Sequence, residues 1–153
     1  GRTRLCLHNW RRITSNPWVL STAGGFRIEF VSHPVQGFLP RDLVFSWEQQ
    51  ALVQAEIESL VRKQAISRVI PGEEPGFIST LFLVPKKDGG FHPVINLRAL
   101  NEVVVYRHFK MEGIHLLRDT LQSQDWMARL DLKDAYFMVP IHPGDRRYLR
   151  FHW

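Results

Sequence analysis

The chain has 153 residues, of which 44% are hydrophobic and 12% aromatic, and its formal net charge is +5. This composition fits one ordinary domain with an apolar core and excludes a disordered tail, while the basic balance favours anionic partners, above all nucleic acid. The single cysteine, Cys6, excludes an internal disulfide. No apolar run approaches the roughly 20 residues that span a bilayer, so we expect no membrane partner. The predicted location of the protein is intracellular, either cytoplasmic or nuclear.

Residues 1–45 form a lead-in segment to which the sequence assigns no chemistry. A short helix is predicted over residues 5–13, and turn-forming Ser-Asn-Pro follows at residues 15–17. Residues 26–31 alternate between apolar and polar side chains, as a strand does.

The clearest helix is predicted over residues 46–63, because Ser46 and Gln49 can form a capping box. An apolar stripe at helical spacing runs along one face, and its pattern predicts core packing. The stripe comprises Val53, Ile57, Leu60 and Val61. A short strand is predicted over residues 65–70.

Two strand-like runs, residues 80–84 and 91–97, are joined by a turn that contains Asp88-Gly89-Gly90. This turn chemistry predicts a β-hairpin. The elements expected after it are a helical turn over residues 98–102, an extended segment over 103–106, and a helix over 113–121 with Ile114, Leu117 and Leu121 facing inward.

The octapeptide Leu-Asp-Leu-Lys-Asp-Ala-Tyr-Phe at residues 130–137 carries the most chemistry. Alternation over residues 126–132 predicts a strand that buries Trp126, Ala128, Leu130 and Leu132 on one face and presents Asp131 on the other. A second acid, Asp134, follows three residues later, and paired carboxylates suit a divalent cation with oxygen ligands, such as Mg²⁺. A helix N-cap formed by Asp131 or Asp134 is the alternative interpretation.

The octapeptide resembles the first catalytic motif of reverse transcriptases, the metal-binding strand of the palm. Upstream, the run Leu-Val-Pro-Lys-Lys-Asp-Gly-Gly-Phe-His-Pro-Val-Ile-Asn-Leu-Arg-Ala-Leu-Asn at residues 83–101 resembles the fingers hairpin of the same family, in the expected order. Residues 139–151 continue the resemblance, which covers roughly residues 45–153. The motifs are most similar to those of LTR and DIRS-like retrotransposons.

The resemblance implies an α+β fold that forms part of a right-hand polymerase. Residues 1–45 would be the lead-in, residues 46–125 a fingers-like region with the hairpin and helices, and residues 126–153 the beginning of the palm with its first strand. The implied activity is RNA-directed DNA synthesis with Mg²⁺, or Mn²⁺ in its place. The implied partners are an RNA or DNA template with primer, deoxynucleoside triphosphates and the remainder of the polymerase polypeptide.

The resemblance also implies a role for individual residues. Asp131 would be the catalytic residue and the metal ligand. Tyr136 resembles the aromatic gate whose ring clashes with a 2′-hydroxyl group, and Asn96 and Arg98 match positions near the template. The implied nucleotide-binding residues are Lys86, His92, Asp134, Ala135 and Tyr136.

Less specific interpretations of the same residues remain open. Lys86 and Lys87 also fit a solvated charged turn, and Tyr136 also fits core packing, the role that we expect for Phe137. Basic and aromatic side chains are interleaved from residue 98 to residue 151, which suits a nucleic-acid strand but is equally typical of solvated arginines.

Two positions depart from the family pattern. His92 stands where relatives most often have Arg, and Asn96 stands where many have Asp. A mostly neutral imidazole replaces a fixed, forked cation, so triphosphate binding should be weaker. Together the two changes are compatible with a decayed element copy.

The second acid pair of the family, a Tyr-x-Asp-Asp hairpin, does not follow Phe137, and Asp145 stands alone in a Pro-Gly-Asp turn. The chain opens on Gly1 and closes in a strand-like run at residues 148–153. We therefore expect a catalytically incomplete fragment of a longer protein. The alternative is a non-enzymatic nucleic-acid-binding remnant or a domesticated copy.

Overall fold

The computed structural model describes residues 1–87, 90–108, 113–132 and 134–153. The described elements are, in order, η1 (Arg2–Cys6), α1 (Leu7–Ile13), α2 (Pro17–Gly24), α3 (Trp47–Arg62), β1 (Ile78–Ser79), β2 (Leu81–Pro85), β3 (Phe91–Ile95), α4 (Arg98–Asn101), α5 (Ile114–Thr120), η2 (Ala135–Phe137), η3 (Pro143–Leu149) and β4 (Arg150–Phe151). Helices and small sheets are therefore mixed along the chain, as expected for an α+β layout.

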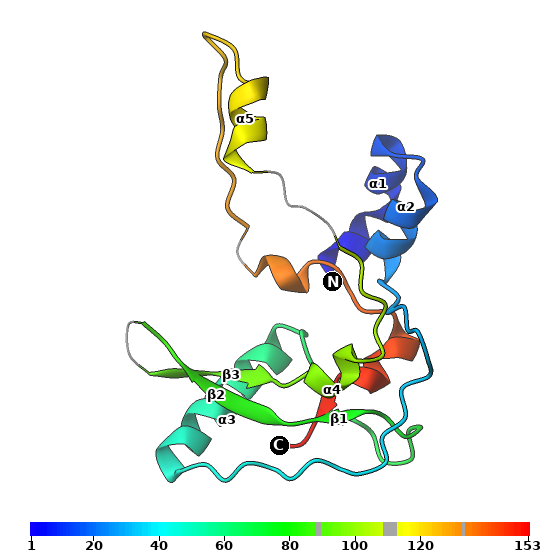
Figure 1. The fold of residues 1–153 in the computed structure, drawn as a ribbon, viewed down its shortest axis with the longest axis vertical. Coiled ribbons are helices and arrows are strands. Elements are labelled where there is room, and N and C mark those ends of the chain that lie inside the picture. Colours follow the sequence, from blue (N-terminus) through cyan, green and yellow to red (C-terminus); the bar gives the residue numbers. More distant parts are fainter. Residues whose placement is uncertain (88–89, 109–112, 133) are drawn as a thin grey trace.

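The elements form a body from which two parts project (Figure 1). The body holds α3, the four strands, α4 and η3, and the helices α1 and α2 rise from it on one side. On the other side α5 and the segment after it, residues 121–132, extend away as an arm, and every residue of that segment is exposed. None of the described helices combines the length and the apolar character needed to cross a bilayer.

Helix α3 begins at the capping box that the sequence predicts. The Ser46 hydroxyl accepts a hydrogen bond from the Gln49 backbone N–H at 3.3 Å, and the Gln49 side chain accepts one from the Ser46 N–H at 3.0 Å. Val53 is fully buried, which confirms the core face of the helix. The stripe ends early, because Val61 on the last turn is exposed.

The predicted hairpin is confirmed. Strands β2 and β3 pair antiparallel, with Leu81 opposite Ile95 at one end and Pro85 opposite Phe91 at the other. The N–H of Lys86 donates to the carbonyl of Gly90 at 3.0 Å, so the pairing extends one step beyond the strands. The turn residues Asp88 and Gly89 lie outside the described residues.

The core of the body is small and is assembled from distant parts of the chain. Phe77, Leu100 and Tyr148 are buried against one another, and Leu100 is only 1% exposed. The ring of Phe30 meets the Tyr148 ring edge-on, with 4.9 Å between the centroids, a favourable aromatic geometry. Strand β1 lies in parallel beside β4, with Ile78 opposite Arg150.

The lead-in contributes more structure than its sequence suggests. The turn predicted at residues 15–17 is the start of α2: the Asn16 side chain accepts from the N–H of Trp18 at 2.9 Å, and Pro17 occupies the first helical position. The strand predicted over residues 26–31 is reduced to two isolated bridges, Phe26 with Ile141 and Phe30 with Val104.

The side chain of Gln36 pairs with the backbone of β1. Its amide nitrogen donates to the Ile78 carbonyl, and its amide oxygen accepts from the Ile78 N–H, both at 2.8 Å. Gln36 therefore occupies the same backbone groups that a neighbouring strand would use.

Asp145 is buried, at 7% exposure, and connects the lead-in to η3. Its carboxylate accepts from the backbone N–H of Ile28 at 3.0 Å and lies 3.6 Å from the guanidinium of Arg27. Arg27 is largely exposed, so the hydrogen bond to the half-buried backbone is the stronger reason for the burial of this acid.

Replacing Asp145 by Ala should therefore destabilise the chain. The Ile28 N–H would lose its acceptor, at a cost of about 1–3 kcal/mol in the free energy of unfolding. Urea denaturation measures this loss. The matched control is Asp131→Ala, which removes the same charge from an exposed position without a described hydrogen bond or ion pair. An equal effect of the two substitutions would contradict the structural role of Asp145.

The strand predicted over residues 126–132 is absent, and these residues are irregular. The face expected to be buried is exposed, with Trp126 at 100%, Leu130 at 89% and Leu132 at 64%. The reason is that no described strand lies beside the segment, and a single strand cannot satisfy its backbone or bury an apolar face alone.

Helix α5 forms where the sequence predicts it, but two of the three side chains expected to face inward are exposed, and that of Leu117 lies outside the described part of the structure. Ile114 is 78% exposed and Leu121 is 39% exposed. The strand predicted over residues 65–70 does not form, and residues 103–106 contribute only the bridge at Val104.

Candidate functional site

The hairpin positions Lys86 and His92 on one face. His92 in β3 pairs with Val84 in β2, and side chains two residues apart on a strand share a face. Lys86 is therefore the diagonal neighbour of His92 across the hairpin. His92 is half-buried, whereas Lys86 and Lys87 are exposed just beyond the end of β2. This pair could place one cation and one imidazole beside an anionic group.

Asn96 and Arg98, the expected template contacts, lie at the junction between β3 and α4. The Asn96 side-chain oxygen accepts from the N–H of Arg98 at 3.2 Å, so this side chain helps to start the helix. Asn96 also borders a small pocket of about 110 Å³, together with Ser79, whose buried hydroxyl has no hydrogen-bond partner among the described residues. Arg98 is exposed.

Asp131 is exposed on the irregular arm next to the octapeptide's first leucine. Among the described residues, no group of three or more His, Cys, Asp or Glu side chains could hold a metal ion. The donor set that the described chain offers is thus too small for a two-ion site, which needs further carboxylates beside Asp131.

Asp134 occupies a left-handed backbone conformation, with φ of 57°, at the N-cap position of η2. The N-cap interpretation is right about its position, but the side chain makes no capping hydrogen bond. Its carboxylate instead pairs with the ammonium of Lys63 at 3.2 Å. Both groups are more than a third exposed, and such pairs contribute about 0.2–1 kcal/mol.

Lys63, at the end of α3, was not predicted as a site residue. It lies 71 residues from Asp134 in the sequence, and no local pattern connects the two positions. The pair anchors the octapeptide to α3 and places a second cation beside the predicted nucleotide-binding residues.

Ala135 and Tyr136 lie on η2, and the Tyr136 side chain is 96% exposed. The core packing expected for Phe137 is wrong, since this ring is 43% exposed. Tyr136 consequently presents a free aromatic surface to solvent, while Phe137 is only partly covered.

The structure does not assemble the predicted site residues into one cluster. Figure 1 shows the hairpin tip and the segment before η2 in separate parts of the molecule. Among the described residues, no hydrogen bond or ion pair connects Lys86 or His92 with Asp131, Asp134 or Tyr136.

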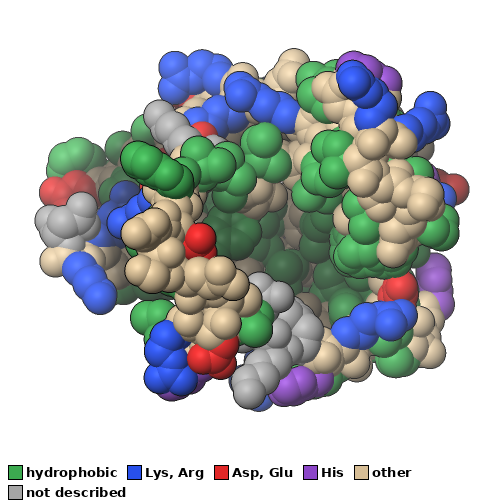
Figure 2. Space-filling view, turned by 90° about the horizontal axis from the view of Figure 1, so that it is seen from above, with side chains coloured by type: hydrophobic (Ala, Val, Ile, Leu, Met, Phe, Trp, Pro, Cys, Tyr) green, Lys and Arg blue, Asp and Glu red, His purple; other side chains and the backbone are tan. Residues whose placement is uncertain are grey.

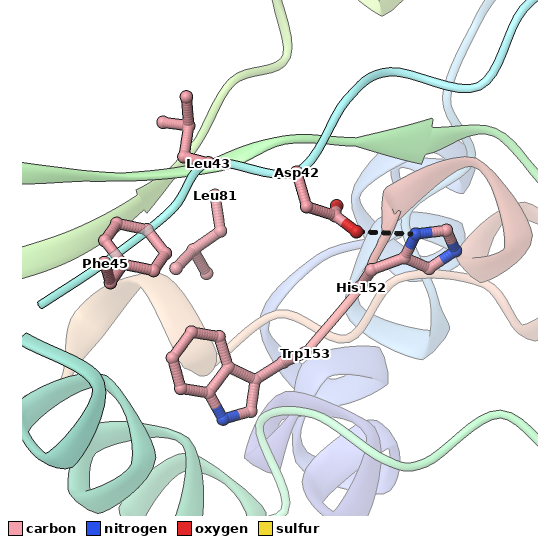
Figure 3. Close-up of a pocket in the computed structure, with 6 residues that line it drawn as sticks. All are labelled: Asp42, Leu43, Phe45, Leu81, His152 and Trp153. Atoms are coloured by element: carbon pink, nitrogen blue, oxygen red, sulfur yellow. Dashed lines mark ion pairs between the residues drawn. The ribbon is translucent and has the colours of Figure 1, made fainter. Parts of the chain in front are cut away.

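A larger pocket, of about 370 Å³, lies at the opposite end of the hairpin from Lys86 (Figure 3). An ion pair borders it, with 3.6 Å between His152 and Asp42, and the rings of Phe45 and Trp153 lie 5.8 Å apart beside it. None of the predicted site residues lines this pocket. This pocket is therefore separate from the octapeptide.

Comparison with known proteins finds similarity to retroelement polyproteins. It is 31% identical over 94 residues to the Gag-Pro-Pol polyprotein of squirrel monkey retrovirus, a match that covers 61% of this chain. It is 33% identical over 88 residues, or 56% of the chain, to the Gag-Pol polyprotein of woolly monkey sarcoma virus. The Transposon Tf2-3 polyprotein of Schizosaccharomyces pombe is 31% identical over 71 residues, or 46% of the chain.

In each case the matched part is about 5% of the length of the polyprotein. No protein-family model matches the chain. The chain is therefore similar to a short segment of retroviral and retrotransposon polyproteins.

Proposed function

We propose that the chain comprises the fingers and the beginning of the palm of a retrotransposon-type reverse transcriptase, an RNA-directed DNA polymerase. The observation that carries the proposal is the order of two motifs, the hairpin sequence at residues 83–101 and the octapeptide at residues 130–137, in a chain similar to retroelement polyproteins. The antiparallel pairing of β2 with β3 supports the first motif.

In this proposal the hairpin faces the triphosphate of an incoming deoxynucleotide. The ammonium of Lys86 neutralises phosphate charge, and His92 beside it supplies one weaker donor. Tyr136 packs its ring against the sugar, with Asp134 and Ala135 as neighbours. Asn96 and Arg98 lie near the RNA or DNA template, which is paired with a primer.

Asp131 is the proposed catalytic residue and ligand of Mg²⁺ or Mn²⁺. When bound, these ions would hold the triphosphate and the primer 3′-oxygen for phosphoryl transfer. Further carboxylates from the remainder of the polymerase polypeptide are required, because the described chain does not provide them.

The exposed arm supports the proposal. Residues 126–132 keep the alternation of a strand but have no described strand beside them. A palm strand without the rest of its sheet would keep the alternating sequence and remain unpaired, because only neighbouring strands can cover its apolar face.

We expect the 153-residue chain to incorporate no nucleotide on a primed poly-A template with dTTP and Mg²⁺, because one acid of the first motif cannot position two cations. A longer polypeptide that continues into a Tyr-x-Asp-Asp hairpin should extend the primer, and Asp131→Asn should abolish that extension. Asp119→Asn, at an exposed position of α5, is the matched control. Extension that survives Asp131→Asn would contradict the proposal.

A second candidate function is a non-enzymatic nucleic-acid-binding remnant or a domesticated copy of the element. The departures at His92 and Asn96 favour it, because both remove a charged side chain from the family pattern. Reading the part of the gene that follows residue 153 distinguishes the candidates. A Tyr-x-Asp-Asp hairpin there favours the polymerase, and its absence favours the remnant.

A further inference from the structure

The basic charge of the chain is concentrated at one end. Residues 1–28 contain five of the 20 Lys and Arg residues and none of the 15 Asp and Glu residues. The rest of the chain therefore holds 15 basic and 15 acidic residues and is balanced. The net charge of residues 1–28 thus equals the formal charge of +5 of the whole chain, and these residues belong to the lead-in that the proposed function leaves without a role.

Four of these arginines lack a described anionic partner. Arg2 and Arg4 on η1, and Arg11 and Arg12 on α1, are exposed, and none of them forms an ion pair within the described residues. The fifth, Arg27, pairs with Asp145. Three arginines elsewhere in the body pair with carboxylates, namely Arg107 with Glu29, Arg147 with Glu74 and Arg150 with Glu73, whereas Arg41, Arg62 and Arg68 are exposed and form no ion pair within the described residues.

The local electrostatics do not explain all four charges. Arg11 and Arg12 lie in the last turn of α1, where the helix dipole favours a cation. Arg2 lies at the start of η1, where the dipole opposes a cation and no acidic residue is present in the first turn, whereas Arg4 lies in the last turn of this short helix. The helix dipole therefore gives no reason for the position of Arg2.

The lead-in is held against the segment that follows the octapeptide. The N–H of Thr3 donates to the Met138 carbonyl at 3.1 Å, and the Thr3 hydroxyl donates to the Ala23 carbonyl at 2.9 Å. The N–H of Phe26 donates to the Pro140 carbonyl at 2.8 Å. Arg2 and Arg4, which flank Thr3, are thus fixed near η2, and Figure 1 shows the N-terminus beside that helix.

We propose that the arginine lobe, defined as Arg2, Arg4, Arg11 and Arg12 on η1 and α1, binds the sugar-phosphate backbone of a nucleic-acid strand that passes η2. Guanidinium groups bind phosphate oxygens through charge-assisted hydrogen bonds and neutralise the regular phosphate charges of such a strand. Trp18 on α2, which is 63% exposed, offers a ring on which a base can stack. Figure 2 shows Lys and Arg side chains spread around the margin of the face that it draws.

Nucleic acid is favoured over other anions by this position. The η1 end of the lobe, with Arg2 and Arg4 on either side of Thr3, lies near η2 through the hydrogen bond from Thr3 to Met138, two residues after Tyr136. An anion bound there would lie beside an exposed aromatic ring, which suits a strand with bases and does not suit an acidic peptide.

The test is binding of a fluorescent 20-nucleotide single strand to the full 153-residue chain, measured by anisotropy at several salt concentrations. The variant replaces Arg2, Arg4 and Arg11 by Gln. The matched control replaces Arg41, Arg62 and Arg68 by Gln, which are exposed, form no ion pair within the described residues and carry the same total charge. Circular dichroism verifies that both variants remain folded.

The lobe variant should weaken binding roughly tenfold or more at low salt, and the control should weaken it much less. The slope of log K against log salt should fall by about 2, because each phosphate contact contributes about 0.7 on a single strand. Equal losses in the two variants, or an unchanged slope, would overturn the proposal. So would displacement of the strand by polyglutamate at matched charge. These binding results do not depend on primer extension. The proposed polymerase role is therefore tested separately, by the extension assay.

Discussion

Replacing Leu100 by Ala should lower the free energy of unfolding by about 2–5 kcal/mol, the largest effect expected of a single substitution in this chain. Leu100 is 1% exposed and packs with Phe77 and Tyr148 in the small core of the body. Truncation removes apolar contacts and leaves a cavity that short surrounding elements fill only in part. Because a whole domain is stable by about 5–15 kcal/mol, this loss would shift the urea midpoint strongly.

The matched control for that measurement is Leu130→Ala. It removes the same atoms from a side chain that is 89% exposed, so its effect should stay within about 0.5 kcal/mol. A large loss for Leu130→Ala would mean that the arm is buried in solution and that the predicted strand forms after all. A small loss for Leu100→Ala would contradict the described core.

The second large effect concerns the nucleotide. In a polypeptide that continues into the second acid pair, His92→Arg should lower the nucleotide Michaelis constant about tenfold or more. A guanidinium with a fixed charge and a forked set of donors replaces an imidazole beside Lys86, and a hydrogen bond to a charged group contributes roughly 1.5–3 kcal/mol. The affinity for the primer–template should change little in His92→Arg. The His92→Ala variant should change the nucleotide Michaelis constant only slightly.

His115→Arg provides the control, because it makes the same change at an exposed position on α5. This control substitution should leave the nucleotide Michaelis constant unchanged. If His92→Arg has no greater effect than this control, the hairpin does not face the triphosphate, and the proposed contact of Lys86 fails with it.

The elements that could be predicted from the sequence are those whose signals are local. The capping box of Ser46 and Gln49 defines the start of α3 within four residues, and the hairpin follows from a turn between two short apolar runs. The beginning of α2 shows the limit of such signals: Asn16 and Pro17 are as typical of a helix N-terminus as of a turn, and only the following residues decide between them.

What could not be predicted depends on partners that are distant in the sequence. The buried carboxylate of Asp145 bonds to the backbone of Ile28, which is 117 residues away in the sequence. Asp134 pairs with Lys63, which is 71 residues away. The alternation over residues 126–132 predicts a face to be covered but cannot supply the strands that cover it. The roles of Lys86 and Asp131 come from resemblance alone, and they stay predictions.

The amide of Gln36 has a consequence for assembly. Because it engages both backbone groups of Ile78, an extra strand cannot dock on that side of β1 without displacing it. One flank of a short, parallel two-stranded sheet is thereby closed to edge-to-edge association, the common first step of aggregation. A single side chain from an irregular loop thus does for this sheet what a covering helix does in larger domains.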